Sequence, residues 1–216
     1  TKVVQSQSDP AKHANEMSCF SISKWLILRL MGVIYFTAFL GAFHQNEGLM
    51  GSYGLRPAEN YMEALKENES SPWIGFKSAP TVFWYFDLND KSMQVVVWAG
   101  LILSAMVVVG FNSWVAQLAL WLLDFSIVSV SGGGSFYGYG WESQILETGF
   151  LSIFLCALPY MTKDSGRWGM NFAWWESGSM EAVALAPSPV VLWLFRWLSF
   201  RISIGAGLIK TRGSSC

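Results

Sequence analysis

The stretch "ISKWLILRLMGVIYFTAFLGAF", residues 22–43, decides the fold because it is apolar over almost its whole length. At about 1.5 Å per residue, a helix of this length crosses a hydrocarbon core of roughly 30 Å. It therefore predicts a first membrane-spanning helix. Two cations lie in its first third: Lys24 can reach the interface, whereas Arg29 lies nearly two turns deeper and needs a partner.

The later segments repeat this apolar character. Residues 93–130 contain Asp124 as their one charged side chain and are interrupted at "GFNSW", so we expect a tight hairpin of two helices over 93–111 and 113–130. The glycine-rich "SGGGSFYGYG" that follows cannot continue a helix. Further apolar segments at 141–160 and 189–210 predict the fourth and fifth helices.

The composition of the whole chain agrees with a lipid environment. Of its 216 residues, 52% are hydrophobic and 13% are charged, which is about half the charged share of a soluble protein. We therefore predict an all-α polytopic membrane protein with about five transmembrane helices over residues 22–210. A polar tail, 1–21, precedes this domain, and 211–216 form a C-terminal tail that is either truncated or naturally short.

An interfacial loop joins the first two predicted helices. Within it, "LRPAENYMEALKE", residues 55–67, predicts a short amphipathic helix that lies on the membrane surface or on a partner. Asn68 begins a formal glycosylation sequon, which matters only where the loop faces a secretory lumen. Lys and Arg are evenly divided between the two sides of the membrane, so the positive-inside rule leaves the topology open.

Several classes of chemistry find no support in the residues. A net charge of −1 without a basic run excludes a nucleic-acid partner. The 3 cysteines are widely separated and the 2 histidines are isolated, so we expect neither a metal site nor a catalytic residue. The protein is predicted to be non-enzymatic and to need no cofactor, with a bound lipid or pigment left open.

Charged side chains inside the predicted helices are the strongest site signal. Each costs roughly 2.5–3.5 kcal/mol at the centre of a membrane, so it faces protein, water or a partner. The favoured interpretation is internal pairing that fixes helix packing, for example Glu147 with Arg196 or Arg201, which lie about 140° apart on their helix. A proton or ion path is the alternative. The candidate network comprises Arg29, Asp124, Glu147, Arg196 and Arg201.

The segment "YGWESQILETGF", residues 139–150, is interpreted as the entry of the fourth helix. Trp141 is placed to anchor at the headgroup level, and Glu142 lies in the first turn, where the helix dipole favours an anion. Glu147 lies about one and a half turns deeper and is the residue expected to need a buried counter-charge.

Three stretches, 29–62, 120–155 and 193–213, resemble in this order the membrane half of the lipase maturation factor family. The most specific pieces are "GWESQ" at 140–144, "LETGF" at 146–150, and "FR" at 200–201 with "GAGLIK" at 205–210. The resemblance marks as family-motif residues Trp141, Glu142, Gln144, Glu147, Gly149 and Lys210.

The resemblance implies a non-enzymatic chaperone or assembly factor of the endoplasmic reticulum that helps secreted lipases fold and assemble into active dimers. It also implies five membrane helices, a cytosolic N-terminus and a lumenal sequon loop. Family members continue past the last helix with Arg-Gly-Asp-x-Cys-Trp, whereas here Arg212-Gly213-Ser214-Ser215-Cys216 carries serine at the aspartate position and ends.

That departure keeps a second interpretation open. The same helices would suit a structural or accessory subunit of a multi-subunit membrane complex, including an organellar one in a mitochondrion or plastid. A transporter is less favoured, because neither repeats nor broken helices are evident. The expected partners are membrane lipids together with either a lipase client or the subunits of a larger complex.

Overall fold

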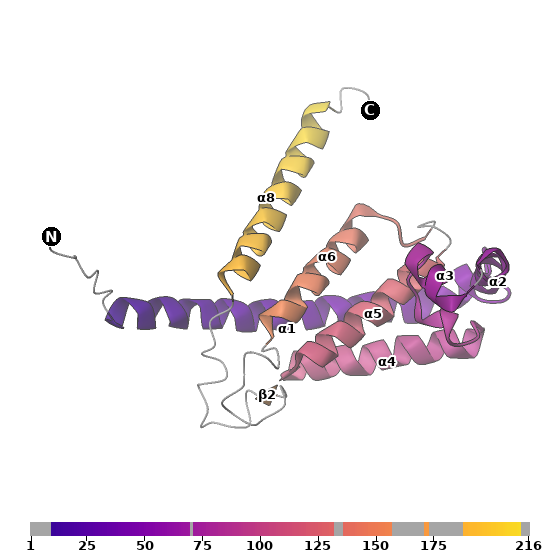
Figure 1. Cartoon of the computed structure of the whole chain (residues 1–216), viewed down its shortest axis with the longest axis horizontal. Coiled ribbons are helices and arrows are strands. Elements are labelled where there is room, and N and C mark those ends of the chain that lie inside the picture. The colour runs from indigo at the N-terminus through magenta and orange to yellow at the C-terminus, as the bar shows by residue number, and fades with distance from the viewer. Residues whose placement is uncertain (1–9, 70, 132–135, 157–170, 173–187, 213–216) are drawn as a thin grey trace.

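The chain is described by a computed structural model that covers residues 10–69, 71–131, 136–156, 171–172 and 188–212. Within these ranges the fold is helical, as predicted (Figure 1). A minimal antiparallel ladder joins β1 to β2 and pairs Phe111 with Phe172. The elements are α1 (Pro10–Met50), α2 (Ala58–Asn68), α3 (Pro72–Ser78), η1 (Val82–Trp84), α4 (Asp90–Val109), β1 (Phe111–Asn112), α5 (Trp114–Val130), α6 (Gly140–Leu155), β2 (Asn171–Phe172) and α8 (Pro189–Arg212).

The bundle is built on α1 and α4, which run side by side in opposite directions (Figure 1). Glycines allow their backbones to come close, since a Cβ atom on Gly100 would lie 2.4 Å from the ring of Phe39. A Cβ atom on Gly32 would likewise lie 2.9 Å from Val107. Small residues at such crossings are typical of helices that associate in membranes, where close packing replaces the hydrophobic effect.

The first helix is longer than its apolar stretch predicted. It begins at Pro10 rather than at residue 22, and it continues past Phe43 to Met50. The polar residues that flank the apolar stretch, 11–21 and 44–50, include no proline and no two adjacent glycines, either of which would stop a helix. It ends where the Gly51 N–H donates to the Asn46 and Glu47 carbonyls, in a tight turn that also uses Gly54.

The hairpin predicted at "GFNSW" is present between α4 and α5. Gly110 has a φ of 131°, which a residue with a side chain adopts only with strain, so glycine is required at this turn. Ser113 caps the next helix, because its side chain accepts a hydrogen bond from the Ala116 N–H. The α5–α6 contact is fixed in turn by Trp121, whose Nε1 donates to the Leu146 carbonyl at 2.9 Å.

Within the described residues, three helical stretches are long and apolar enough to cross a membrane: Ile22–Met50, Asp90–Val109 and Pro189–Thr211. Two shorter helices, α5 with 17 residues and α6 with 16, occupy the other predicted spans. The last residues of the predicted fourth span, 157–160, lie outside the described ranges. The chain is therefore an all-α integral membrane protein with a helix at each predicted span.

The predicted amphipathic helix in the first loop is α2. Its Ala58 and Met62 are buried in the main core, so this helix packs on the end of the bundle through its apolar face. Asn68 is exposed at its end, where Nδ2 donates to the Ala64 carbonyl.

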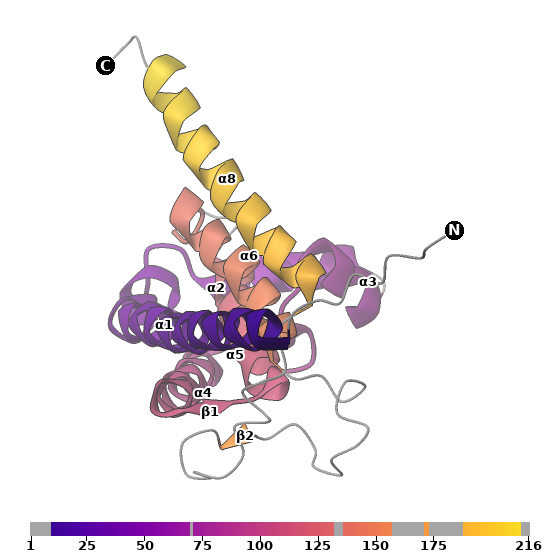
Figure 2. The ribbon, with the colours of Figure 1, turned by 90° about the vertical axis from the view of Figure 1, so that its left-hand side faces the viewer.

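The last helix, α8, rises away from the bundle (Figures 1 and 2). Its first turns pack through Val191 against Leu28 and Leu155, and further along it contacts α6. Most of its aromatic face is exposed, including a stack of Trp193 on Trp197. A surface of this kind suits contact with lipid.

Candidate functional site

One predicted cross-helix pair is present in the structure. Arg201 of α8 donates through Nη2 to the Glu147 carboxylate of α6, in an ion pair that joins the two helices. Both side chains remain about half exposed on the protein itself, with fractional exposures of 51% and 44%. The pair therefore lies at the lipid-facing seam between α6 and α8 rather than in the core.

The other predicted charges do not join this pair in a single network. Arg29 donates through Nη1 to the Val108 carbonyl of α4, and its guanidinium lies 5.1 Å from the ring of Trp25. Arg196 is exposed on α8. Asp124 is half-buried on α5 and lines a cavity together with a second acid, Glu142, with no cation among the described residues of that lining.

Burial reverses the roles expected of the two acids on α6. Glu142 is only 6% exposed, although the sequence placed it at the interface near water. Its Oε2 accepts a hydrogen bond from the Tyr139 N–H at 3.3 Å, which closes the first turn of the helix. Glu147, expected to be the buried residue, is exposed and paired. Helical periodicity predicts the angle between the two side chains around the helix axis. It does not predict which face of α6 packs against α1 and α5.

The remaining family-motif residues divide between packing and surface positions. Gly149 is buried against Tyr35 of α1, and a Cβ atom there would lie 1.8 Å from the tyrosine oxygen. Trp141, Gln144 and Lys210 are exposed. Gly149 thus has a packing role in the bundle, which the sequence alone did not indicate.

A polar contact that sequence reasoning missed joins α1 to the segment before α6. The Tyr137 hydroxyl donates to Asn46 Oδ1 at 2.6 Å. Burial, together with the carboxyls of Glu142 and Asp124, raises the pKa of Tyr137 to about 12, so its phenol stays protonated and able to donate. The two residues are 91 positions apart, and no pattern in the sequence links them.

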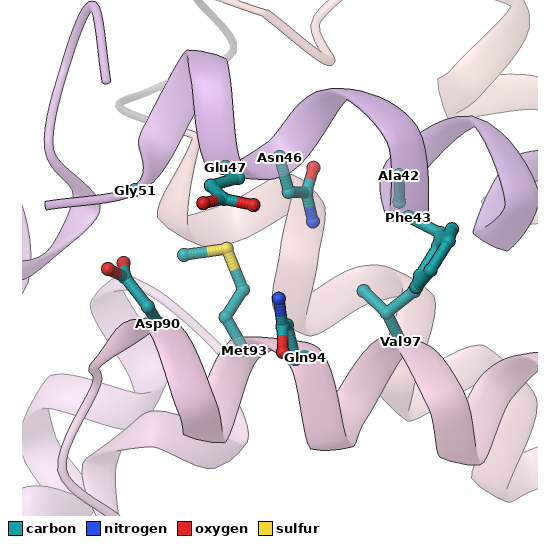
Figure 3. A pocket seen from close by; sticks show the side chains of 9 residues that line it. All are labelled: Ala42, Phe43, Asn46, Glu47, Gly51, Asp90, Met93, Gln94 and Val97. Carbon is teal, nitrogen blue, oxygen red and sulfur yellow. The ribbon is translucent and has the colours of Figure 1, made fainter. Parts of the chain in front are cut away.

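On the other side of Asn46, a small pocket of about 20 Å³ lies between α1 and α4. Figure 3 shows Asn46 and Glu47 directed toward α4, with Met93 and Gln94 directed back toward α1. The Asn46 Nδ2 atom is buried and has no hydrogen-bond partner in the described part of the chain. At the rim, Asp90 accepts hydrogen bonds from the backbone N–H and the hydroxyl of Ser52, at 2.9 and 2.6 Å.

Replacing Tyr137 with phenylalanine tests the value of this contact. We expect a loss of about 1–3 kcal/mol in the free energy of unfolding, because the buried Asn46 amide would then lack a partner on both atoms. Thermal unfolding in detergent measures it. Tyr53→Phe, at a fully exposed position, is the matched control. Equal stability of the two variants would show that the contact contributes nothing.

Together, the helical bundle and its intramembrane charges define a polytopic all-α membrane protein held by cross-helix polar contacts. Within that class, the chain belongs to the lipase maturation factor family. Residues 22–216 match the family model described as the lipase maturation factor transmembrane domain. The resemblance noted from the sequence is confirmed.

The curated relatives are two kinds of lipase maturation factor. The chain is 39% identical to lipase maturation factor 1 of Bos taurus over 202 residues, which cover 91% of this chain and 33% of the relative. It is 40% identical to the Mus musculus protein of the same name over 202 residues, covering 91% and 32%. Lipase maturation factor 2 of Xenopus laevis is 28% identical over 183 residues, covering 82% and 23%. The chain thus spans about a third of the length of the first two relatives. No solved structure matches it.

Proposed function

We propose that the chain is the membrane domain of a non-catalytic lipase maturation factor, which assists the folding and assembly of secreted lipases from the endoplasmic reticulum membrane. The observation that carries this proposal is the match of residues 22–216 to the family's transmembrane domain. The match includes the entire predicted membrane domain, from the apolar part of α1 through α8.

The positions of the motif residues support a structural role for this domain. Gly149 lets α6 pack against α1, and Glu147 ties α6 to α8. Residues that hold helices together are what an assembly factor needs to present its extramembrane surfaces in a fixed arrangement. In the topology that the resemblance implies, the end of the bundle that carries α2 and Asn68 faces the lumen.

A domain exchange tests the proposal. In cells that lack their own lipase maturation factor, residues 22–216 would replace the membrane domain of full-length lipase maturation factor 1, and secreted lipase activity would be measured. We expect the chimera to restore active secreted lipase, whereas the relative without any membrane domain does not. The proposal fails if the chimera reaches the normal level and location but the cells secrete only inactive lipase.

Placement in the endoplasmic reticulum has its own readout in the same cells. A glycan on Asn68 that an endoglycosidase removes, and that is absent from Asn68→Gln, is the expected result for a lumenal loop. Co-migration of the unmodified chain with a mitochondrial or plastid complex in native gels would instead overturn both the compartment and the lipase role.

A further inference from the structure

A cavity of about 290 Å³ lies between α1, α5 and the start of α6. Two acids, Asp124 and Glu142, contribute to its lining, and aromatic side chains surround them. The aromatic residues are Phe39, Phe136, Tyr137, Tyr139 and Trp141. Among the described residues that line this cavity there is no Lys, Arg or His. An anionic and aromatic lining of this kind is complementary to a cation.

Neither carboxylate has its hydrogen-bonding capacity filled by the protein. Glu142 is more than nine-tenths buried, yet the contact found for it is the 3.3 Å hydrogen bond from the Tyr139 N–H to Oε2. In the described part of the chain, Oε1 of Glu142 and both oxygens of Asp124 receive no hydrogen bond. A buried carboxylate is costly unless it is paired, and among the described residues neither acid forms an ion pair.

A second, more open hollow continues from this cavity toward the lipid. It has a volume of about 530 Å³ and lies between α1, α6 and α8. The two share part of their lining, namely Thr37, Ala38, Trp141 and Ile145, so they lie next to one another. The walls of the outer part include Met31, Ile34 and Ile202, which are apolar. An elongated ligand would thus meet apolar walls outside and acids inside.

We propose that this space binds a choline phospholipid from the surrounding bilayer. The quaternary ammonium lies between Asp124 and Glu142 and against the aromatic rings, while an acyl chain follows the groove between α1, α6 and α8. Aromatic faces attract quaternary ammonium groups through cation–π interaction, and the two carboxylates supply the opposite charge. The groove opens beside the splayed α8, so a lipid enters from the membrane without crossing the core.

The choice of a lipid rests on the shape and setting of the space. A soluble amine would need no apolar groove, and a metal ion would leave the aromatic lining without a role. The combined volume lies in the range of roughly 300–1,000 Å³ that is usual for small-molecule sites. This inference does not depend on the lipase role, because lipid binding is measured on the chain itself.

Lipid retention by the purified chain provides the test. The 216-residue chain would be reconstituted in nanodiscs that contain equal amounts of phosphatidylcholine, phosphatidylethanolamine and phosphatidylglycerol with the same acyl chains. After transfer to detergent, the retained lipids are quantified by mass spectrometry. We expect phosphatidylcholine to be enriched about tenfold over phosphatidylglycerol, which corresponds to about 1.4 kcal/mol.

Variants locate the site. Asp124→Asn combined with Glu142→Gln is expected to abolish the enrichment, whereas Glu63→Gln, at an exposed position on α2 outside both spaces, should keep it. Trp141→Leu, at an exposed position where the cavity meets the groove, is expected to weaken it and serves where the double variant does not fold. Lipids retained in bulk proportion by the native chain would overturn the proposal. Retention of phosphatidylethanolamine equal to that of phosphatidylcholine would overturn the choice of a choline group.

Discussion

Replacing Gly149 with alanine is expected to lower the free energy of unfolding by about 3 kcal/mol, the upper part of the range for overpacked cores. A Cβ atom at this position would lie 1.8 Å from the oxygen of Tyr35 and 2.9 Å from its Cζ atom. Tyr35 is completely buried and its ring packs against Phe39, so it has little room to withdraw. Either α6 must then move away from α1 or the tyrosine must leave its rotamer.

A double-mutant cycle separates this clash from other effects of alanine. Tyr35→Phe removes the clashing oxygen, which has no hydrogen-bond partner among the described residues, so this change alone should cost little. Combined with Gly149→Ala, it should restore part of the lost stability, because the ring carbon Cζ at 2.9 Å still has to shift. Thermal unfolding of the four proteins in detergent gives the coupling energy.

Gly205→Ala is the matched control for the same substitution. A Cβ atom at Gly205 would meet nothing within 4 Å, and Gly205 also lies inside a helix. Alanine is favoured over glycine there by about 1 kcal/mol of helix propensity, so this variant should be as stable as the native chain or more stable. Equal destabilisation by Gly149→Ala and Gly205→Ala would contradict the steric explanation.

The contrast between these glycines shows what the sequence could predict about the fold. Apolar length gave the helical class and the position of each span, because crossing a membrane requires it. Helix ends were harder to predict, since α1 ends at the backbone hydrogen bonds of Gly51 rather than where its apolar residues end. Nor does the presence of glycine locate a close helix contact: Gly205 has no close neighbour among the described residues, whereas at Gly149 a large partner from α1 fills the space.

For the candidate site, the sequence identified charged residues but not their partners. Periodicity places a residue on a face of its own helix, whereas pairing depends on how helices distant in the chain are rotated and tilted. Glu147 and Arg201 are 54 positions apart, and either arginine of α8 satisfied the pattern. Asp124 and Glu142 were expected to find cations or water, yet they line the same cavity. This placement of Asp124 and Glu142 arises from the packing of α1 against α5 and α6, which the sequence of a single helix does not reveal.

Neutralising Glu147 should have the other large effect, because it leaves Arg201 alone within the membrane. Both residues lie near the middle of their helices, where an unpaired charge costs roughly 2.5–3.5 kcal/mol. In water, an ion pair this exposed would contribute little, but both helices lie at predicted membrane spans, where the surroundings are hydrocarbon. We therefore expect Glu147→Gln to lower stability by about 3 kcal/mol and to loosen α8, which otherwise contacts the bundle mainly near its start.

Thermal unfolding in nanodiscs would measure this loss of stability. The decisive variant is the one in which the two charges are exchanged. Glu147→Arg should be at least as harmful as Glu147→Gln, and adding Arg201→Glu should recover most of the stability, since the pair is restored with its charges reversed. Arg196→Gln is the control on the same helix. Within the described residues Arg196 forms no ion pair, so its neutralisation should be harmless or stabilising. A chain that tolerates Glu147→Gln as well as Arg196→Gln would not be held together by this pair, and α8 would then depend on its apolar contacts, among them those with Leu28 and Leu155.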